Sequence, residues 1–278
     1  MIPLDNVEKW SPILDERAAQ VLSAEELRGY QSIPAAERQR QLQALLEKPV
    51  AQFSAVNEVY FRARWAEVLN LAAPGPDFTL LEIASGDADM IPQTMARACP
   101  HSRYVTANMN RLLTESLRRK TRDLPLNVAV IEEDAAGIER HLPAGSVDLI
   151  AFQHAVNDVI QAILCDREGV DTIYADWMET LPKMITILQR ETEAGTLAEH
   201  TKAPFLGLLR SLLRVLRPDG LVVMSHYMFQ LDLDWGYPPA LWENMIPMAR
   251  EWVQGLEGCE EVSVEGFDPQ WWLFLRKA

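Results

Sequence analysis

The sequence is poor in cysteine, in long hydrophobic runs and in positive charge. Its 278 residues include three cysteines, spaced far apart with no CxxC or Cys/His pattern, so we expect neither a disulfide framework nor a metal site. No uncharged apolar run approaches the roughly 20 residues that span a bilayer, and the amino end has no basic segment followed by an apolar one. We therefore expect a soluble, cytoplasmic protein without a membrane partner.

Acidic residues outnumber basic ones, 40 to 26, which gives a formal net charge of -14 at pH 7. Such a field repels a phosphate backbone or an anionic membrane surface. With 48% hydrophobic and 24% charged residues, the composition is that of a globular protein with a sizeable core. We expect a small-molecule substrate and no nucleic-acid partner, and whether the chain forms a homo-oligomer stays open.

The first 75 residues are predicted to form a helical cap. Apolar residues recur there every three or four positions, as in amphipathic helices, and Ser23 with Glu26 three residues later makes a capping-box start. A further helix is predicted over roughly Ala51 to Leu71, because residues 73–77 read APGPD and cannot continue it. We place a domain boundary there, between residues 1–75 and a second domain that follows.

Residues 76–278 alternate short apolar runs with helical stretches, which is typical of a parallel sheet with helices on both faces. The stretch of about 157–204 is too long for a structureless loop and predicts a helical insertion, interrupted at Pro182 and stopped at Gly195. Two runs at the carboxyl end predict an antiparallel pair at the sheet edge. The fold class is therefore α/β, a doubly wound, seven-stranded and mostly parallel sheet with an antiparallel C-terminal strand. The predicted strands are 79–84, 103–108, 127–133, 147–153, 220–227, 260–266 and 271–277.

The segment LLEIASGDADM, residues 80–90, is the most informative local motif. Small side chains let the backbone turn tightly and approach a ligand, and the helix that follows offers unpaired N–H groups. Gly86 keeps one of the three positions where a nucleotide-binding turn usually has glycine, whereas Ala84 and Ala88 occupy the other two. This segment alone is equally compatible with an ordinary strand-to-helix turn.

The order of motifs along the chain resembles the class I S-adenosylmethionine-dependent methyltransferase family. The turn is followed by a strand ending at Asn108, by Glu133-Asp134-Ala135, by LPAGSVDLIAFQHAVND at 142–158, and by RVLRPDG at 214–220. The similarity covers roughly Thr79 to Ala278. It implies a Rossmann-like fold, S-adenosyl-L-methionine as the cofactor, and methyltransferase activity.

The resemblance also assigns cofactor-binding roles. Glu82 matches the acid that organises the turn around the methionine part, and Asn108 stands where the family usually has an acid that binds the ribose. An amide can accept one hydrogen bond and donate another, but it lacks the charge. Met109 suits the adenine face, and Asp134 matches the position that reads the adenine amino group, with a helix cap as its alternative role. The predicted cofactor-binding set is Glu82, Ala84, Ser85, Gly86, Asp87, Ala88, Asn108, Met109, Asp134, Ala135 and Gln153.

The catalytic candidates follow the fourth strand, beside the expected sulfonium. An imidazole titrates near neutrality, so His154 could take a proton from an acceptor, or it could be a structural hydrogen-bonding group. Asn157 could orient an amine or a carboxylate, or cap the next helix. Side chains from the insertion and the fifth strand could reach the same pocket. The catalytic candidates are His154, Asn157, Tyr174 and Tyr227.

Three functions stay open on this basis. The leading one is methyl transfer to an oxygen, nitrogen or carbon of a small molecule, because the helical cap and the insertion would cover the carboxyl edge of the sheet and exclude water. The second is intramolecular cyclisation of S-adenosylmethionine to azetidine-2-carboxylate and methylthioadenosine, because the chain is similar overall to azetidine-2-carboxylate synthases, an offshoot of the family. The third is a non-catalytic cofactor-binding or interaction protein, supported only by the missing glycines.

Overall fold

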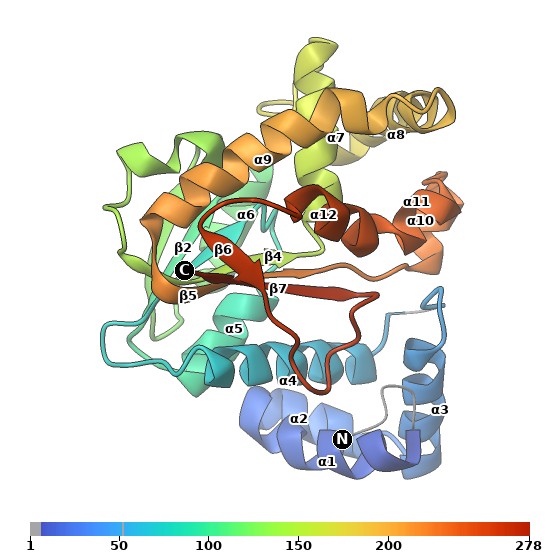
Figure 1. The fold of residues 1–278 in the computed structure, drawn as a ribbon. Helices are drawn as coiled ribbons and strands as arrows, with labels where there is room; N and C mark the ends of the chain where they lie inside the picture. The colour runs from blue at the N-terminus through green and yellow to red at the C-terminus, as the bar shows by residue number, and fades with distance from the viewer. Residues whose placement is uncertain (1–6, 52) are drawn as a thin grey trace.

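The computed structural model describes residues 7–51 and 53–278, which form a seven-stranded sheet between layers of helices (Figure 1). The strand order is β3-β2-β1-β4-β5-β7-β6, in which β1 to β5 pair in parallel and β7 runs antiparallel to both β5 and β6. This order confirms the predicted fold class, including the antiparallel pair at the edge. The strands are β1 (Thr79–Ile83), β2 (Arg103–Ala107), β3 (Asn127–Ile131), β4 (Val147–Gln153), β5 (Leu216–Ser225), β6 (Cys259–Glu261) and β7 (Trp272–Lys277).

Helices connect the parallel strands and extend the chain before and after them. None of them, in the described part of the chain, is long and apolar enough to cross a lipid bilayer. They are α1 (Val7–Val21), α2 (Ala24–Ser32), α3 (Ala35–Leu46), α4 (Ala55–Leu71), α5 (Met90–Ala98), α6 (Arg111–Thr121), the 3₁₀ helix η1 (Ala135–Arg140), α7 (Val156–Arg167), α8 (Trp177–Glu193), α9 (Leu197–Val215), α10 (Gln230–Trp235), α11 (Pro239–Glu243) and α12 (Met245–Val253).

The N-terminal helices form a layer on one face of the sheet. Helix α4 lies against α5, and α1 to α3 lie outside α4 (Figure 1). Trp10 of α1 and Trp65 of α4 share one apolar core with Leu80 of β1 and Tyr104 of β2. Capping-box hydrogen bonds between Ser23 and Glu26 start α2, as the sequence predicts. The boundary at residue 75 stays a prediction, because this core crosses it.

The predicted position of these helices over the carboxyl edge is only partly right. A cavity lies at that edge of the sheet. Among the described residues that precede β1, Phe53 and Phe61 are the two that line it. Helix α4 is buried on nearly its whole circumference, because α1 and α3 cover the side that faces away from the sheet. The N-terminal helices therefore build the sheet's lower layer and supply two aromatic side chains to the edge.

The insertion forms the opposite layer. Helices α7, α8 and α9 pack together above the other face of the sheet, with α12 beside them (Figure 1). The predicted interruption at Pro182 is wrong, since α8 continues through it. Proline cannot donate to the carbonyl of Met178 and its ring crowds that carbonyl, but buried Leu181, Met184 and Ile185 hold the helix on the core. The predicted stop at Gly195 is confirmed, with φ of 70° between α8 and α9.

Candidate functional site

A cavity of about 1060 Å³ lies at the carboxyl ends of the parallel strands. Its wall combines the turns after β1 and β2, the start of η1, the ends of β4 and β5, one side of α7, the segment 170–178 and helix α10. In doubly wound folds ligands bind at this edge, where neighbouring connections diverge. The cavity therefore has both the position and the size of a ligand site.

The turn after β1 requires a left-handed backbone at two positions. Ala84 has φ of 52° and Gly86 has φ of 59°. A Cβ atom on Gly86 would meet only Leu113 Cδ1, at 3.6 Å, so the backbone conformation rather than lack of space favours glycine there. Ala84 adopts this conformation at a cost of about 1–2 kcal/mol. Strain of this kind persists where surrounding structure imposes it, often beside a ligand.

Hydrogen bonds hold the turn against the second strand. The Ser85 hydroxyl lies 2.9 Å from the hydroxyl of Thr106 in β2. The Asn108 side-chain amide donates to the Gly86 carbonyl at 2.6 Å. Because this bond uses the Nδ2 donor, the acceptor oxygen of Asn108 is the atom left to meet a ligand hydroxyl. The amide that replaces the expected acid thus also braces the turn.

Asp134 caps the helix that follows β3. Its Oδ1 accepts from the backbone N–H of Ala136 at 2.8 Å, so the alternative role as a cap is confirmed. The residue is exposed and also lines the cavity, so capping leaves Oδ2 for a second partner. Ten of the eleven residues predicted to bind the cofactor line the cavity, namely Ala84, Ser85, Gly86, Asp87, Ala88, Asn108, Met109, Asp134, Ala135 and Gln153.

Glu82 is the predicted cofactor residue that does not line the cavity. Its carboxyl group is 1% exposed inside the sheet layer, where Oε2 accepts from the Tyr104 hydroxyl at 2.7 Å. Burial raises the pKa of Glu82 to about 8. Near neutral pH the carboxyl group is therefore mainly protonated, and its bonded partner is in β2 rather than in the turn.

Gln153 and His154 end β4 at the centre of the cavity wall. The Oε1 atom of Gln153 is buried and has no hydrogen-bond partner among the described residues. A buried polar atom without a partner is costly, and this one belongs to a residue that lines the cavity. A ligand with a hydrogen-bond donor would satisfy it.

His154 is fixed between two rings. Its imidazole stacks on that of His226 with centroids 4.2 Å apart, and the edge-to-face ring of Phe229 lies at 5.4 Å. Nε2 lies 3.6 Å from Oδ2 of Asp232, and Nδ1 accepts a long, 3.4 Å contact from the backbone N–H of Tyr227. Both ring nitrogens thus face protein groups, an arrangement that orients the ring. His226 is fully buried, and burial lowers its pKa well below the usual value.

Two aspartates accompany His154. Asp232 also accepts from the indole N–H of Trp242 at 3.0 Å, which fixes its carboxylate on α10. Asp158, on the first turn of α7, accepts from the Asn157 side-chain amide at 2.9 Å. The pKa of Asp158 is raised to about 7, mainly by burial; His154 opposes this rise and the charge of Asp232 adds to it. Asp158 is therefore the carboxyl group of this cluster whose protonation changes near neutrality.

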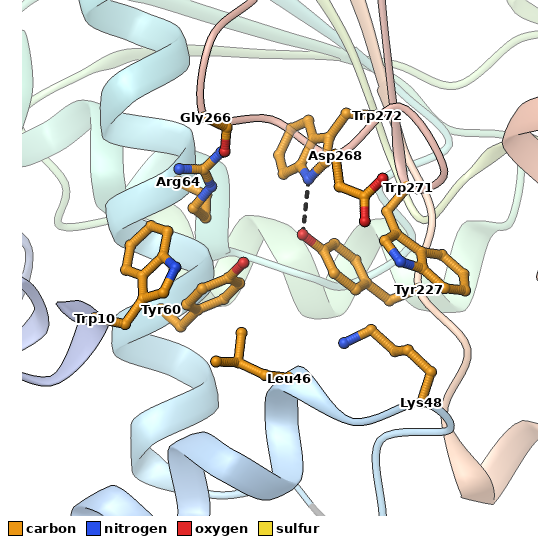
Figure 2. Close-up of a pocket in the computed structure, with 10 residues that line it drawn as sticks. All are labelled: Trp10, Leu46, Lys48, Tyr60, Arg64, Tyr227, Gly266, Asp268, Trp271 and Trp272. Atoms are coloured by element: carbon orange, nitrogen blue, oxygen red, sulfur yellow. Dashed lines mark hydrogen bonds between the residues drawn. The ribbon is translucent and has the colours of Figure 1, made fainter. Parts of the chain in front are cut away.

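The other three catalytic candidates do not present their polar groups to the cavity. Asn157 is 5% exposed and lies behind Asp158, and the side chain of Tyr174 is 69% exposed outside the cavity wall. Tyr227 lines the cavity, but its hydroxyl points to the far side, where it accepts from the Trp272 indole N–H at 2.7 Å (Figure 2). Lys48 lies over the Tyr227 ring on that far side (Figure 2).

Sequence reasoning missed several residues of the cavity. Asp232 and Phe229 lie four to seven residues after β5, and the rule that ligands bind at the carboxyl ends of strands is the signal that could have found them. Phe53 precedes α4 and stacks on Phe229 with centroids 4.9 Å apart. Nothing local in the sequence pairs residues so distant along the chain.

Comparisons with known proteins identify structural similarity without sequence similarity. No family model and no curated protein matches the chain. Similar solved structures include a SAM-dependent methyltransferase from Aquifex aeolicus, at 14% identity, 81% coverage of this chain, 98% of that chain and a TM-score of 0.46. Precorrin-6y C5,15-methyltransferase from Geobacter metallireducens has 12% identity, coverage of 79% and 89%, and a TM-score of 0.42. DszA carbon methyltransferase has 12% identity, coverage of 97% and 70%, and a TM-score of 0.47.

The strand order defines the fold. Strands β3-β2-β1-β4-β5 are parallel, and β7 and β6 extend the sheet as an antiparallel pair. The seven strands and the antiparallel C-terminal strand are what the resemblance in the sequence predicts. The chain therefore has the Rossmann-like fold of the class I S-adenosylmethionine-dependent methyltransferases.

Proposed function

We propose that the chain binds S-adenosylmethionine in the cavity and transfers its methyl group to an oxygen, nitrogen or carbon of a small molecule. The observation that carries this proposal is the continuity of the cavity, which extends from the strained turn at Gly86 to the His154, Asp158 and Asp232 cluster. When bound, the cofactor supplies an electrophilic methyl group on a sulfonium. Every other requirement falls on the residues of this chain.

The residues of the cavity wall fit this cofactor. The turn from Ala84 to Ala88 allows close approach of a ligand, and the free oxygen of Asn108 can accept from a ribose hydroxyl. Asp134 has one carboxylate oxygen left for an amino group, and Gln153 has an unused acceptor. These groups match the donors of an adenosine and an amino acid.

The carboxylate cluster would handle the proton of the acceptor. Asp158 titrates near neutrality, where a general base works well. His154 has protein groups at both ring nitrogens. It would therefore orient Asp232 and the acceptor, and would not itself take the proton of the acceptor. Apolar side chains form much of the remaining wall and limit the access of water.

The volume of the cavity favours transfer over cyclisation. Ligand pockets for a single small molecule are about 300–1,000 Å³, and this cavity, at about 1060 Å³, has room for a cofactor and a second molecule. Cyclisation of S-adenosylmethionine would need no second molecule. The net charge of -14 supports a small acceptor over a nucleic acid.

Calorimetry with S-adenosylhomocysteine tests the cofactor site. We expect saturable binding to the wild type, and at least about tenfold weaker binding for Gly86→Val, because a β-branched residue strains a φ of 59°. Asp134→Ala should also weaken binding. Absence of heat with the wild type would favour a non-catalytic role, and unchanged binding by both variants would refute this position of the site.

Incubation with S-adenosylmethionine alone separates the two reactions. We expect the cofactor to stay intact over the enzyme's incubation, because transfer requires an acceptor. Enzyme-dependent formation of methylthioadenosine, detected by mass spectrometry, would instead support cyclisation. A Gly86→Val sample serves as the control for spontaneous breakdown.

A further inference from the structure

The inner end of the cavity has negative charge that no strong cation neutralises. Asp158 and Asp232 flank His154, and both line the cavity. Among the described residues, no lysine or arginine side chain forms an ion pair with either carboxyl group. Aspartates also dominate the remaining charged wall, where Arg167 is the one arginine of the described lining. Low-dielectric walls focus such a field toward cationic ligands.

A continuous aromatic wall leads from this cluster to the mouth of the cavity. Phe229 contacts His154 edge-to-face, Phe53 stacks on Phe229, and Phe61 approaches Phe229 with centroids 6.1 Å apart. The faces of aromatic rings attract cations and also pack against alkyl or aryl groups. The wall therefore suits a ligand with a positive head and an apolar body.

The mouth itself is lined with exposed apolar side chains. Eight large hydrophobic residues of the described chain are exposed, and six of them line this one cavity. Exposed apolar residues gathered at one place mark a binding surface. Helix α10 presents both a buried carboxyl group and exposed apolar side chains to the cavity, since Asp232 is 8% exposed whereas Leu231 and Trp235 are 50% and 41% exposed. The six residues are Phe53, Leu112, Ile173, Met178, Leu231 and Trp235.

From these three features we infer that the acceptor is an amphiphilic amine, whose nitrogen lies beside Asp158 and Asp232 and whose apolar body follows Phe229 and Phe53 to the mouth. This inference rests on the proposed function and adds the substrate class to it. A carboxylate or phosphate acceptor would place its negative charge beside two aspartates that no lysine or arginine pairs with among the described residues, which disfavours it.

The chemistry of an amine acceptor balances within this site. The ammonium first gives one proton to Asp158, which frees the nitrogen lone pair. The nitrogen then forms a bond to the methyl carbon as the carbon–sulfur bond breaks, and the sulfur keeps that electron pair as a neutral thioether. Asp158 later returns its proton to water. The transfer needs no oxidant or reductant.

Equilibrium binding tests the substrate class without relying on turnover. The protein is first saturated with S-adenosylhomocysteine, and n-octylamine, n-butylamine, n-octanol and octanoate are then titrated by calorimetry. We expect n-octylamine to bind at least about tenfold more tightly than octanol or octanoate. Each buried methylene strengthens binding about fourfold, so n-butylamine should bind up to about 200-fold more weakly than n-octylamine.

Variants separate the charge from the apolar wall. Asp232→Asn keeps an acceptor for the Trp242 indole and should weaken n-octylamine binding at least about tenfold while octanol binding changes less than about twofold. Asp234→Asn, an exposed residue of the same helix outside the cavity wall, removes the same charge and should change neither. Phe53→Ala should reduce the difference between n-octylamine and n-butylamine.

The outcomes distinguish this inference from the proposed function. If S-adenosylhomocysteine binds and octanoate binds as tightly as n-octylamine, the amine assignment is wrong and the cofactor site stands. Equal effects of Asp232→Asn and Asp234→Asn would also overturn it. If S-adenosylhomocysteine does not bind, the proposed function fails, whatever the amines do.

Discussion

Glu82→Gln should change how the stability of the fold depends on pH. The Glu82 carboxyl group is 1% exposed and burial raises its pKa from 4.5 to about 8. A carboxyl group whose folded pKa is raised contributes stability that is fully present below its unfolded pKa, near 4.5. That contribution is lost as the pH rises toward the folded pKa, because the unfolded chain releases the proton first.

The magnitude follows from the two pKa values. Linkage between pKa values of 4.5 and about 8 gives a loss of about 1 kcal/mol near pH 5 and about 4 kcal/mol near pH 8. Glutamine has nearly the same shape and does not titrate. Its Oε1 can accept from Tyr104, but its amide protons lack an evident partner, at a cost of about 1–3 kcal/mol. This cost does not depend on pH and cancels in a comparison of two pH values.

Urea unfolding of the wild type and the variant, near pH 5 and near pH 8, measures the effect. We expect the stability of Glu82→Gln relative to the wild type to rise by about 3 kcal/mol between the two pH values. Glu115→Gln is the matched control, because the Glu115 side chain is 69% exposed on α6, and its relative stability should change by less than about 0.5 kcal/mol.

Parallel pH dependence in the Glu82→Gln variant and the wild type would refute the reasoning, because it would mean that the buried carboxyl group ionises freely. Binding of S-adenosylhomocysteine gives a second readout. We expect the dissociation constant to change less than about threefold, since the Glu82 carboxyl contacts Tyr104 and does not line the cavity.

Two further substitutions test the site. Ala84→Gly should stabilise the protein by about 0.5–1 kcal/mol in urea unfolding, because relief of a φ of 52° outweighs the flexibility that glycine adds. The control Ala98→Gly, in helix α5, should destabilise the protein by up to about 1 kcal/mol. A loss of stability in both variants would contradict backbone strain at Ala84. In carbon-13 spectra of aspartate-labelled protein, one carboxyl resonance should titrate near pH 7 and be missing in Asp158→Asn, because burial raises the pKa of Asp158 to about 7; titration of every aspartate near pH 4 would contradict this.

The sheet could be predicted from the sequence because each of its central strands is a short apolar run bounded by turn residues. Such runs have a local signature, and the rules of parallel pairing limit their order. Pro182 shows where local signals fail. The packing of its helix on the core outweighs one lost hydrogen bond, and that packing depends on residues far away in the sequence.

The cavity could be predicted in part for the same reason. Its cofactor side is built from turns that directly follow strands, so motif order locates Gly86, Asn108 and Asp134. Its other side is built by tertiary contacts between Phe53, Phe229 and helix α10, which have no motif. The orientation of a side chain could not be predicted from the sequence either, as the Tyr227 hydroxyl, which points toward Trp272, shows.

A crystal structure of the protein soaked with S-adenosylhomocysteine tests the central claim most directly. We expect electron density for the ligand in the cavity, with the ribose hydroxyls at Asn108, the backbone of Gly86 against the amino-acid part, and the sulfur facing the cluster of His154, Asp158 and Asp232. An empty cavity at saturating ligand, or the ligand bound elsewhere on the chain, would contradict it.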